Sequence, residues 1–295
     1  MQPHVKPKST IPDLFQWGKQ TYVMGVINAT PDSFSGDGFD LDEDPVRTAV
    51  GLGKQFVADG AHLLDVGGES SRPGAEPVAA EQELRRVTPV IEALADAVDV
   101  PISVDTSKAI VARKALASGA SIINDVWGLK HDREIANVVA DHGAAIILMH
   151  NRSHSEEASA DKRLGGRYVG SKYGELLPDI RRELEESIAL AQAANIPAKK
   201  IIIDPGIGFG KTVEQNRRIL NELCTLKELG YPLLIGPSRK SFIGYTLNVP
   251  LEDRLEGTAA AVAVGITRGA DMVRVHDVRA MARVARMTDA IIRTV

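Results

Sequence analysis

Three polar acceptor residues interrupt apolar runs that are otherwise typical of buried strands. Asp105, Asn124 and Asp204 each lie at or near the end of such a run. Asp and Asn in these places often cap the next helix, and capping explains any one of them as well as a binding role does. Three of them at one end of a closed sheet favour a shared pocket, because caps have no need to converge. Two carboxylates and an amide suit a ligand with several N–H donors, such as an aminopyrimidine ring, since a carboxylate accepts two parallel hydrogen bonds.

Two cations occur in later runs of the same kind. Lys240 belongs to Ser238-Arg-Lys-Ser241, and Arg274 lies inside Met272–Asp277, two residues before His276. Side chains two apart on a strand share a face, so Arg274 and His276 are expected to point the same way. A cation in an apolar strand is costly unless it is paired or bound, and barrels commonly bind phosphate near their last two strands. The pattern therefore predicts a site for a phosphorylated substrate.

Two further patterns are weaker. The run Gly206–Thr212 ends in Gly-Lys-Thr between a predicted strand and a helix, as a P-loop does, but the P-loop glycine five residues before Gly210 is Pro205 here. We therefore reject a P-loop. His150 and His154 have the spacing of a helical zinc site, yet they fall at a strand end and in a loop, which does not favour a metal site.

Eight apolar runs, each followed by a helical pattern, are the elements that would position these residues. The runs are Tyr22–Asn28, Leu63–Gly68, Ile102–Thr106, Ile122–Val126, Ile146–His150, Ile201–Gly206, Leu233–Lys240 and Met272–Asp277. Runs without polar alternation suit strands that are buried on both faces. Eight strand–helix units predict an α/β fold, the (β/α)8 TIM barrel, whose chemistry lies at the C-terminal strand ends. We expect a loose N-terminal arm over residues 1–20 and a single barrel domain over residues 21–295.

Three connections after these strands are too long for simple links: residues 29–44, 69–80 and 151–174. Long loops in a compact domain are usually lids, binding loops or disordered segments. All three follow strands, so they are expected on the same face of the barrel as the polar residues.

The composition limits the class of protein. The chain has 35 basic and 39 acidic residues, for a net charge of -4, which argues against a nucleic-acid or membrane-surface partner. Cys224 is the only cysteine, so it forms no intrachain disulfide, and its apolar neighbours predict a thiol packed in a helix. No stretch approaches the roughly 20 apolar residues of a membrane span, and the N-terminus lacks a signal-peptide core. A cytoplasmic location is expected.

The order of the motifs resembles that of the dihydropteroate synthases, the pterin-binding enzymes of folate biosynthesis that sulfonamides inhibit. The motifs are Met24-Gly-Val-Ile-Asn-Ala-Thr-Pro-Asp-Ser-Phe-Ser35, Asp65-Val-Gly-Gly-Glu-Ser-Ser-Arg-Pro-Gly74, Ser103-Val-Asp-Thr-Ser107, Ile123-Asn-Asp125, Leu148-Met-His150, Asp204-Pro-Gly-Ile-Gly-Phe-Gly-Lys211, Ser238-Arg-Lys-Ser-Phe242 and Val273-Arg-Val-His276. Any one alone would be weak, and together they are specific.

The resemblance implies a role for each matching position. The residues implied for the pterin ring are Asp105, Asn124, Met149, Asp204, Phe209, Lys240 and Arg274. Those implied for the diphosphate are Asn28, Ser71, Arg72, Arg274 and His276, with Mg2+ as cofactor between the diphosphate and Asn28. Those implied for 4-aminobenzoate are Phe34, Pro73, Phe209 and Ser241. The implied catalytic residues are Arg72, Lys240, His276 and a loop acid, for which Asp32 and Asp37 both remain open.

The implied reaction condenses (7,8-dihydropterin-6-yl)methyl diphosphate with 4-aminobenzoate. The resemblance implies dissociative substitution, with 7,8-dihydropteroate and diphosphate as products and a homodimer as the assembly. One alternative is a methyltetrahydrofolate methyltransferase on the same barrel, which has no use for the residues around a diphosphate. The other is a catalytically silent pterin-binding paralogue, against which the intact residues Arg72, Lys240, Arg274 and His276 argue.

Overall fold

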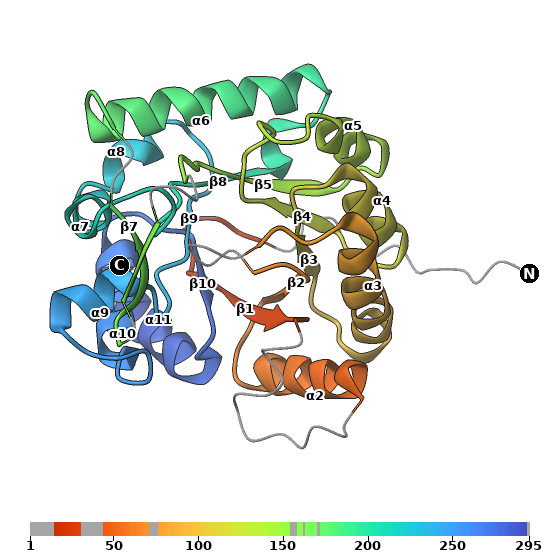
Figure 1. The fold of residues 1–295 in the computed structure, drawn as a ribbon, viewed down its shortest axis with the longest axis horizontal. Coiled ribbons are helices and arrows are strands. Elements are labelled where there is room, and N and C mark those ends of the chain that lie inside the picture. The colour runs from red at the N-terminus through yellow and green to blue at the C-terminus, as the bar shows by residue number, and fades with distance from the viewer. Residues whose placement is uncertain are drawn as a thin grey trace, which may run out of the picture.

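A computed structural model describes residues 15–30, 44–70, 76–153, 158–161, 163–169 and 172–293. The elements in chain order are β1 Tyr22–Asn28, α2 Pro45–Ala58, β2 Leu63–Gly67, α3 Ala80–Ala97, β3 Ile102–Asp105, α4 Ala109–Ala117, β4 Ile122–Asp125, α5 Glu134–Asp141, β5 Ala145–Met149, β6 Ala158–Asp161, β7 Gly165–Tyr168, α6 Leu176–Ala193, η3 Ala198–Lys200, β8 Ile201–Asp204, α7 Val213–Asn221, α8 Cys224–Lys227, β9 Leu234–Ile235, α9 Ser241–Leu247, α10 Leu255–Thr267, β10 Met272–Val275 and α11 Val278–Ile292. The helices surround a central group of strands (Figure 1).

The central strands form one parallel sheet in the order β8-β5-β4-β3-β2-β1-β10-β9. A parallel bridge between Ile203 and Leu233 joins the two end strands, β8 and β9. The sheet is therefore a barrel, and the predicted (β/α)8 fold is confirmed. Each of the eight predicted runs overlaps one of its strands.

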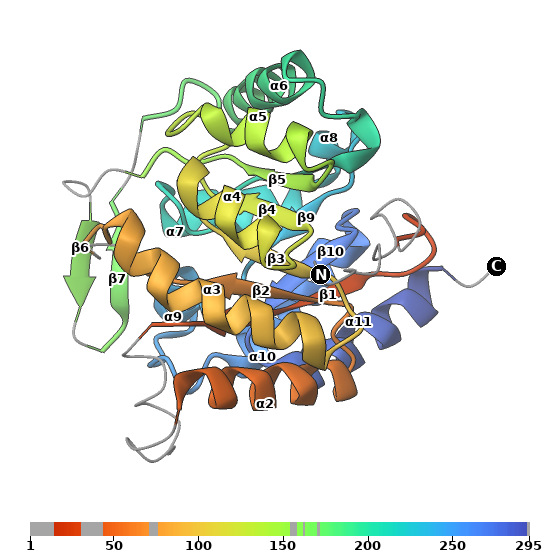
Figure 2. The ribbon, with the colours of Figure 1, turned by 90° about the vertical axis from the view of Figure 1, so that its right-hand side faces the viewer.

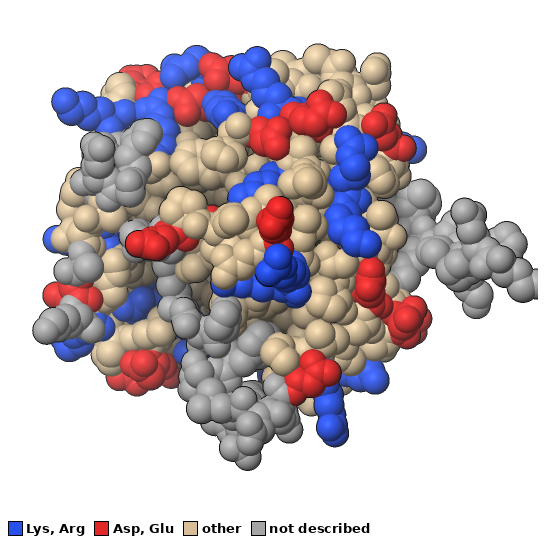
Figure 3. Space-filling model, turned by 45° about the vertical axis from the view of Figure 1, so that its right-hand side comes forward, with Lys and Arg blue, Asp and Glu red and all other residues tan. Residues whose placement is uncertain are grey.

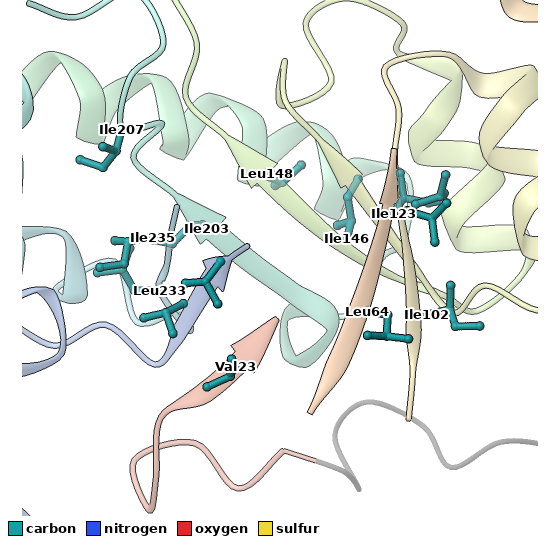
Figure 4. Packing of buried hydrophobic residues seen from close by; sticks show 14 of the residues in the cluster. Val23, Leu64, Ile102, Ile123, Ile146, Leu148, Ile203, Ile207, Leu233 and Ile235 are labelled. Carbon is teal, nitrogen blue, oxygen red and sulfur yellow. The ribbon is translucent and has the colours of Figure 1, made fainter. Parts of the chain in front are cut away.

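The barrel strands are apolar on both faces because each face packs against a different apolar layer. One set of alternate residues packs with the helices in a single buried cluster, part of which Figure 4 shows: Val23, Leu64, Ile123, Ile146, Leu148, Ile203 and Ile235. The other set fills the barrel interior: Tyr22, Met24, Leu63, Ile122, Ile147, Ile202, Leu234 and Met272. This double burial explains why the strands read as continuous apolar runs.

Phe15 and Trp17, which fall in the predicted loose arm, pack against the barrel. Phe15 is 4% exposed and belongs to the interior cluster. Its ring centroid lies 4.6 Å from that of Tyr22 and 5.2 Å from that of Trp17. Offset and edge-on contacts of this kind stabilise aromatic pairs. The aromatic group therefore covers the N-terminal end of the barrel.

Local signals explain the first helix, and one local prediction fails. Asp44 Oδ1 accepts from the N–H of Val46 at 3.0 Å, Pro45 is the first residue of α2, and Gly60 follows the helix with φ +106°. An Asp cap, a Pro at the first helical position and a Gly after the end are typical helix signals. The prediction of a packed thiol at Cys224 is wrong: the residue lies in α8 as expected, but it is exposed.

The predicted loop 151–174 contains a two-stranded antiparallel hairpin, β6–β7. Figure 2 places it at the opposite end of the molecule from the C-terminus. The hairpin is held from α9 and its surroundings: Tyr245 donates to the carbonyl of Gly165 at 3.2 Å, and Arg254 donates to that of Leu164 at 2.8 Å. Because these contacts are to polar groups, the hairpin strands lack the apolar alternation that would have predicted them.

The surface carries both signs of charge. On the face shown in Figure 3, basic and acidic side chains are interspersed. Within the described ranges, no helix combines the length and apolar character that crossing a membrane requires.

Candidate active site

The barrel interior changes from apolar to polar toward the C-terminal ends of the strands. Alternate residues of each strand face the barrel interior, and toward the C-terminal strand ends most of these interior-facing residues are polar. These are Asn28, Asp65, Asp105, Asn124, Met149, Asp204 and Arg274. The acceptors Asp105, Asn124 and Asp204 therefore lie together at one end of the barrel. This favours a shared pocket over helix capping, because caps have no need to converge.

Arg274 is the centre of a cluster that joins four strands, β10, β2, β3 and β4. Its Nε donates to Asp65 Oδ2 at 2.6 Å, and its Nη2 donates to Asp105 Oδ2 at 2.8 Å. Asn124 Nδ2 donates to the same Asp65 oxygen at 3.0 Å. These bonds orient the amide of Asn124, so that its carbonyl oxygen points away from Asp65 and is available as an acceptor.

Two carboxylates in this cluster share one guanidinium. Burial raises the pKa of Asp105 to about 7, although the charge of Arg274 opposes the shift, and Asp65 adds to it. A buried carboxyl group beside a like charge holds its proton more tightly. Asp105 therefore titrates near neutral pH, and a ligand with N–H donors would favour its ionised form.

Asp204 is the last residue of β8, and a turn follows it directly. Its Oδ1 accepts from the N–H of Gly206 at 2.7 Å, so a ligand in the barrel would meet the other carboxylate oxygen. Burial raises the pKa of Asp204, and both Lys240 and the Gly206 N–H oppose the shift. Gly206 has φ +70°, a conformation in which a residue with a side chain is strained.

Lys240 lies beside this turn. Its Nζ donates to the carbonyl oxygen of Ile207 and lies 4.4 Å from the ring centroid of Phe209. Burial lowers the pKa of Lys240 to about 7, against the opposing charge of Asp204. Both forms are therefore accessible near neutral pH, and a ligand carbonyl would favour the ammonium form.

The rim above Arg274 carries a second group of polar residues. His276 is exposed and its Nδ1 lies 3.0 Å from Ser238 Oγ. Arg239 has φ +54°, and its side chain binds both oxygens of Asp277, at 2.7 and 2.6 Å. The ion pair fixes an otherwise unfavourable backbone next to Lys240.

The other predicted site residues divide into those the structure places and those it does not describe. Asn28 is half-buried at the end of β1, Met149 is buried at the end of β5, and Ser241 is the first residue of α9. Outside the described residues lie Asp32, Phe34, Asp37, Ser71, Arg72 and Pro73.

Sequence reasoning did not identify Asp65 as a site residue, nor the group that surrounds Lys211. Asp65 begins one of the family motifs and received no role there, although an acid inside a strand buried on both faces is a sufficient signal. Lys211 is 2% exposed and its Nζ lies 3.0 Å from His150 Nδ1, while His150 Nε2 lies 3.1 Å from Glu183 Oε2. Glu183 lies on the distant helix α6, so no local pattern could have linked it to Lys211.

The described residues contain no group of three or more His, Cys, Asp or Glu side chains that could hold a metal ion. A surface cavity of about 620 Å3 lies at the other end of the barrel, where its lining includes His62, Arg279, Arg283 and Arg286. The three arginines are exposed. In this fold the chemistry lies at the C-terminal ends of the strands, so the polar interior rather than this cavity is the candidate site.

Comparison with known proteins supports this location. The sequence matches the family described as pterin binding enzyme over residues 24–276. It is 47% identical over 283 residues to the dihydropteroate synthase of Bacillus subtilis, covering 96% of this chain and 93% of the relative. It is also 47% identical over 280 residues to that of Clostridium beijerinckii, covering 95% and 97%.

Solved structures agree with the sequence comparison. The dihydropteroate synthase of Clostridium difficile, determined in the presence of pteroic acid, has a TM-score of 0.86 and 44% identity, with 95% of this chain and 100% of that chain covered. The enzyme of Xanthomonas albilineans in complex with 7,8-dihydropteroate has a TM-score of 0.80 and 38% identity, with 94% and 95% covered. This chain therefore belongs to the pterin-binding enzyme family and, within it, to the dihydropteroate synthases, which are transferases of alkyl groups other than methyl.

Proposed function

We propose that this chain condenses (7,8-dihydropterin-6-yl)methyl diphosphate with 4-aminobenzoate and releases 7,8-dihydropteroate and diphosphate. The observation that carries the proposal is the polar barrel interior, in which Asp105, Asn124 and Asp204 face Lys240 and Arg274. Structures of the Xanthomonas albilineans enzyme with 4-aminobenzoic acid and with 7,8-dihydropteroate support both ends of the reaction.

In this proposal the pterin ring lies between the two halves of the interior. Its N–H donors meet Asp105, Asp204 and the carbonyl oxygen of Asn124. Lys240 donates to the ring carbonyl, and Arg274 stacks on a ring face. Met149 and Phe209 line the slot. Buried ligand donors need such acceptors, because an unpaired polar group in a dry site costs about 1–3 kcal/mol.

The diphosphate would lie toward the rim, near Asn28, Ser71, Arg72, Arg274 and His276. Mg2+ fits this place as an ion bound chiefly through the substrate. The carboxamide oxygen of Asn28, half-buried at the end of β1, is a hard ligand, and magnesium usually takes one or two protein oxygens with water and phosphate as the rest. When bound, the ion supplies positive charge that makes diphosphate a better leaving group.

The residues of the chain then act on developing charge. As the C–O bond to diphosphate breaks, positive charge grows on the pterin, and Asp105 and Asp204 stabilise it, while Arg72 and His276 hold the departing anion. The amine of 4-aminobenzoate attacks from a pocket that comprises Phe34, Pro73, Phe209 and Ser241. The loops 29–44 and 69–80 exclude water. Asp32 and Asp37 remain the two candidates for the loop acid at the reaction centre.

Release of diphosphate tests this function. The purified chain, given both substrates and Mg2+, is expected to release diphosphate only when 4-aminobenzoate is present. Arg72→Ala is expected to lose roughly 3 kcal/mol of transition-state stabilisation, or about a hundredfold in turnover, yet to bind a non-reactive pterin like the parent. A parent that binds pterin but releases no diphosphate would be the silent paralogue. Equal turnover of variant and parent at saturation would contradict the role of Arg72.

We also propose that the protein is a homodimer that pairs through α10 and α11. Val264 on α10 is 43% exposed, and Met287 and Ile291 on α11 are each 64% exposed. Met287 and Ile291 are four residues apart on one helical face, and the two helices pack side by side. Apolar side chains gathered in this way favour a partner surface.

Charging this surface is expected to weaken the dimer. Burying one such side chain contributes about 1.5–3 kcal/mol, so Met287→Lys should raise the dimer dissociation constant at least about tenfold. Sedimentation velocity over a range of concentrations measures the constant. Ile110→Lys is the matched control, because Ile110 is 60% exposed on the distant helix α4. A parent that stays monomeric at every concentration would rule out the proposed assembly.

Two properties follow from the family and remain proposals. Sulfonamides would compete for the 4-aminobenzoate pocket; the Yersinia pestis dihydropteroate synthase has been solved as a sulfonamide drug complex. The cytoplasm is the proposed location of the protein.

A further inference from the structure

The ammonium group of Lys211 is buried at the end of the turn Asp204–Gly210, and no step of the proposed reaction uses it. Its Nζ donates to the carbonyl oxygens of Gly206 and Phe209, both at 2.9 Å, and lies 3.0 Å from His150 Nδ1. Burial lowers the pKa of Lys211 to about 7, against the opposing charge of Asp204, because a buried ammonium is costly unless its donors are satisfied. The turn supplies two of the acceptors that the buried Lys211 ammonium needs, so its fold and the position of Lys211 depend on each other.

Behind Lys211, a chain of side chains continues to the protein surface. Burial, followed by the charge of Lys211, lowers the pKa of His150 to about 4, so its ring is neutral. In the neutral ring, Nδ1 accepts from Lys211 and the N–H at Nε2 donates to Glu183 at 3.1 Å. Arg152 Nε donates to the same carboxylate at 3.0 Å. The hydrogen bonds that link Lys211, His150, Glu183 and Arg152 thus each have a defined donor and acceptor.

The backbone of the turn explains why it needs a cation. Gly206, Gly208 and Gly210 have φ +70°, +84° and +62°. A Cβ at Gly206 would collide with the carbonyl oxygen of His150, and one at Gly210 would collide with the backbone of Arg152. The turn therefore lies directly on the segment after β5, and two of its carbonyl oxygens converge on the place that Lys211 Nζ fills. Without the ammonium both oxygens would lose this shared donor, and within this turn Gly206 O would keep the bond from the N–H of Phe209, at 3.1 Å.

We propose that Lys211 is a positioning residue, whose ammonium holds the turn so that Asp204, the Ile207 carbonyl and Phe209 present Lys240 to the pterin. The contacts of Lys240 support this route, because its Nζ donates to Ile207 O and lies over the ring of Phe209. Its effect on turnover rests on the proposed function, whereas its effect on the turn does not. The Gly-Lys-Thr that resembles a P-loop is thus turned inward, with its lysine bound to its own backbone.

Removal and replacement of the ammonium test the proposal. In Lys211→Ala, kcat/KM for the pterin substrate is expected to fall at least about tenfold, equivalent to about 1.4 kcal/mol, while KM for 4-aminobenzoate changes less. Ethylammonium is expected to restore most of the lost activity with saturable dependence, because it supplies an N–H donor group to the vacated place. Tetramethylammonium at equal concentration has no N–H donor and is expected to restore nothing.

Lys200→Ala is the matched control. Lys200 Nζ also donates to a backbone carbonyl, that of Gly143, but at the N-terminal end of the barrel. This variant is expected to keep the parent pterin affinity and to show no response to ethylammonium.

Deuterium exchange of the peptide 204–211 separates the two proposals. Faster exchange in Lys211→Ala, with recovery in ethylammonium, supports the positioning role even if the parent shows no turnover, a result that would overturn only the proposed function. An active parent together with unchanged exchange and unchanged pterin affinity in Lys211→Ala would overturn the positioning role. Loss of activity that ethylammonium does not restore would also overturn it, since the ammonium would then not be the group that matters.

Discussion

Asp204→Asn is expected to weaken the binding of a non-reactive pterin by at least about a hundredfold, equivalent to about 2.7 kcal/mol. Asn keeps the oxygen that accepts from the Gly206 N–H, so the turn retains its bond. The other oxygen becomes an NH2 group, which faces the donors of the ring instead of accepting from them. Hydrogen bonds to a charged group contribute about 1.5–3 kcal/mol. Calorimetric titration with the pterin measures the change.

Asp125→Asn is the matched control for this prediction. Asp125 is also a buried carboxylate at a strand end, but it accepts from the N–H groups of Trp127 at 2.9 Å and Leu129 at 2.7 Å, and its side chain is in the outward-facing row of β4. Its replacement should lower stability and leave pterin affinity unchanged. If Asp204→Asn bound the pterin as tightly as the parent, the ring would not lie against Asp204.

Arg274→Met is expected to lower the free energy of unfolding by about 3–5 kcal/mol, the usual loss when one partner of a buried ion pair is removed. The substitution leaves Asp65 and Asp105 without their shared cation. Arg274 is 19% exposed in its side chain, and the two carboxylates are 0% and 12% exposed, so solvent cannot replace it. Urea unfolding followed by circular dichroism measures the loss.

The pH dependence of this loss has a defined sign. The pKa of Asp105 in the folded protein is raised to about 7, above the roughly 3.9 of an unfolded aspartate. Its ionisation therefore lowers stability as pH rises between those values. Without Arg274, which opposes the shift, the folded pKa rises further. The deficit of the variant should thus be largest above pH 7 and smaller at pH 5, where Asp105 is protonated in both proteins.

A second arginine serves as the control for the Arg274 prediction. Arg239 also binds a carboxylate through two bonds, but its side chain is 33% exposed and that of Asp277 is 20% exposed. Arg239→Met should therefore cost less and vary less with pH over the same range. A deficit of Arg274→Met that is equal at pH 5 and pH 8 would mean that Asp105 does not carry the charge in question.

The barrel was predictable from the sequence because its signals are local. Each strand is an apolar run, and both layers that bury it are apolar, so the runs are continuous. The strand ends were visible for the same reason: Asp105, Asn124 and Asp204 stand out against apolar neighbours. The convergence of these three residues followed from closure of the barrel rather than from any pattern of their own.

What the sequence did not reveal depends on contacts between distant segments. The β6–β7 hairpin is held by Tyr245 and Arg254, which lie about eighty to ninety residues away in the chain. Lys211 has a motif that suggests phosphate, and only the fold shows that it turns inward to His150. Cys224 has buried neighbours on both sides of its exposed position, Leu223 and Leu226, because a helix as short as α8 presents one side to solvent.

The barrel is closed at the junction between β8 and β9 by few residue pairs, and this place lies next to the proposed ligand. Only the bridge from Ile203 to Leu233 joins these strands among the described ladder pairs, whereas β1 and β2 pair at five positions. Asp204 ends one strand of the junction, and Lys240 follows the other. In the proposed pose, a pterin held by both residues spans the place where the sheet has fewest hydrogen bonds. Binding of the pterin and closure of the barrel between β8 and β9 are then thermodynamically coupled. The bound substrate therefore stabilises the closed barrel.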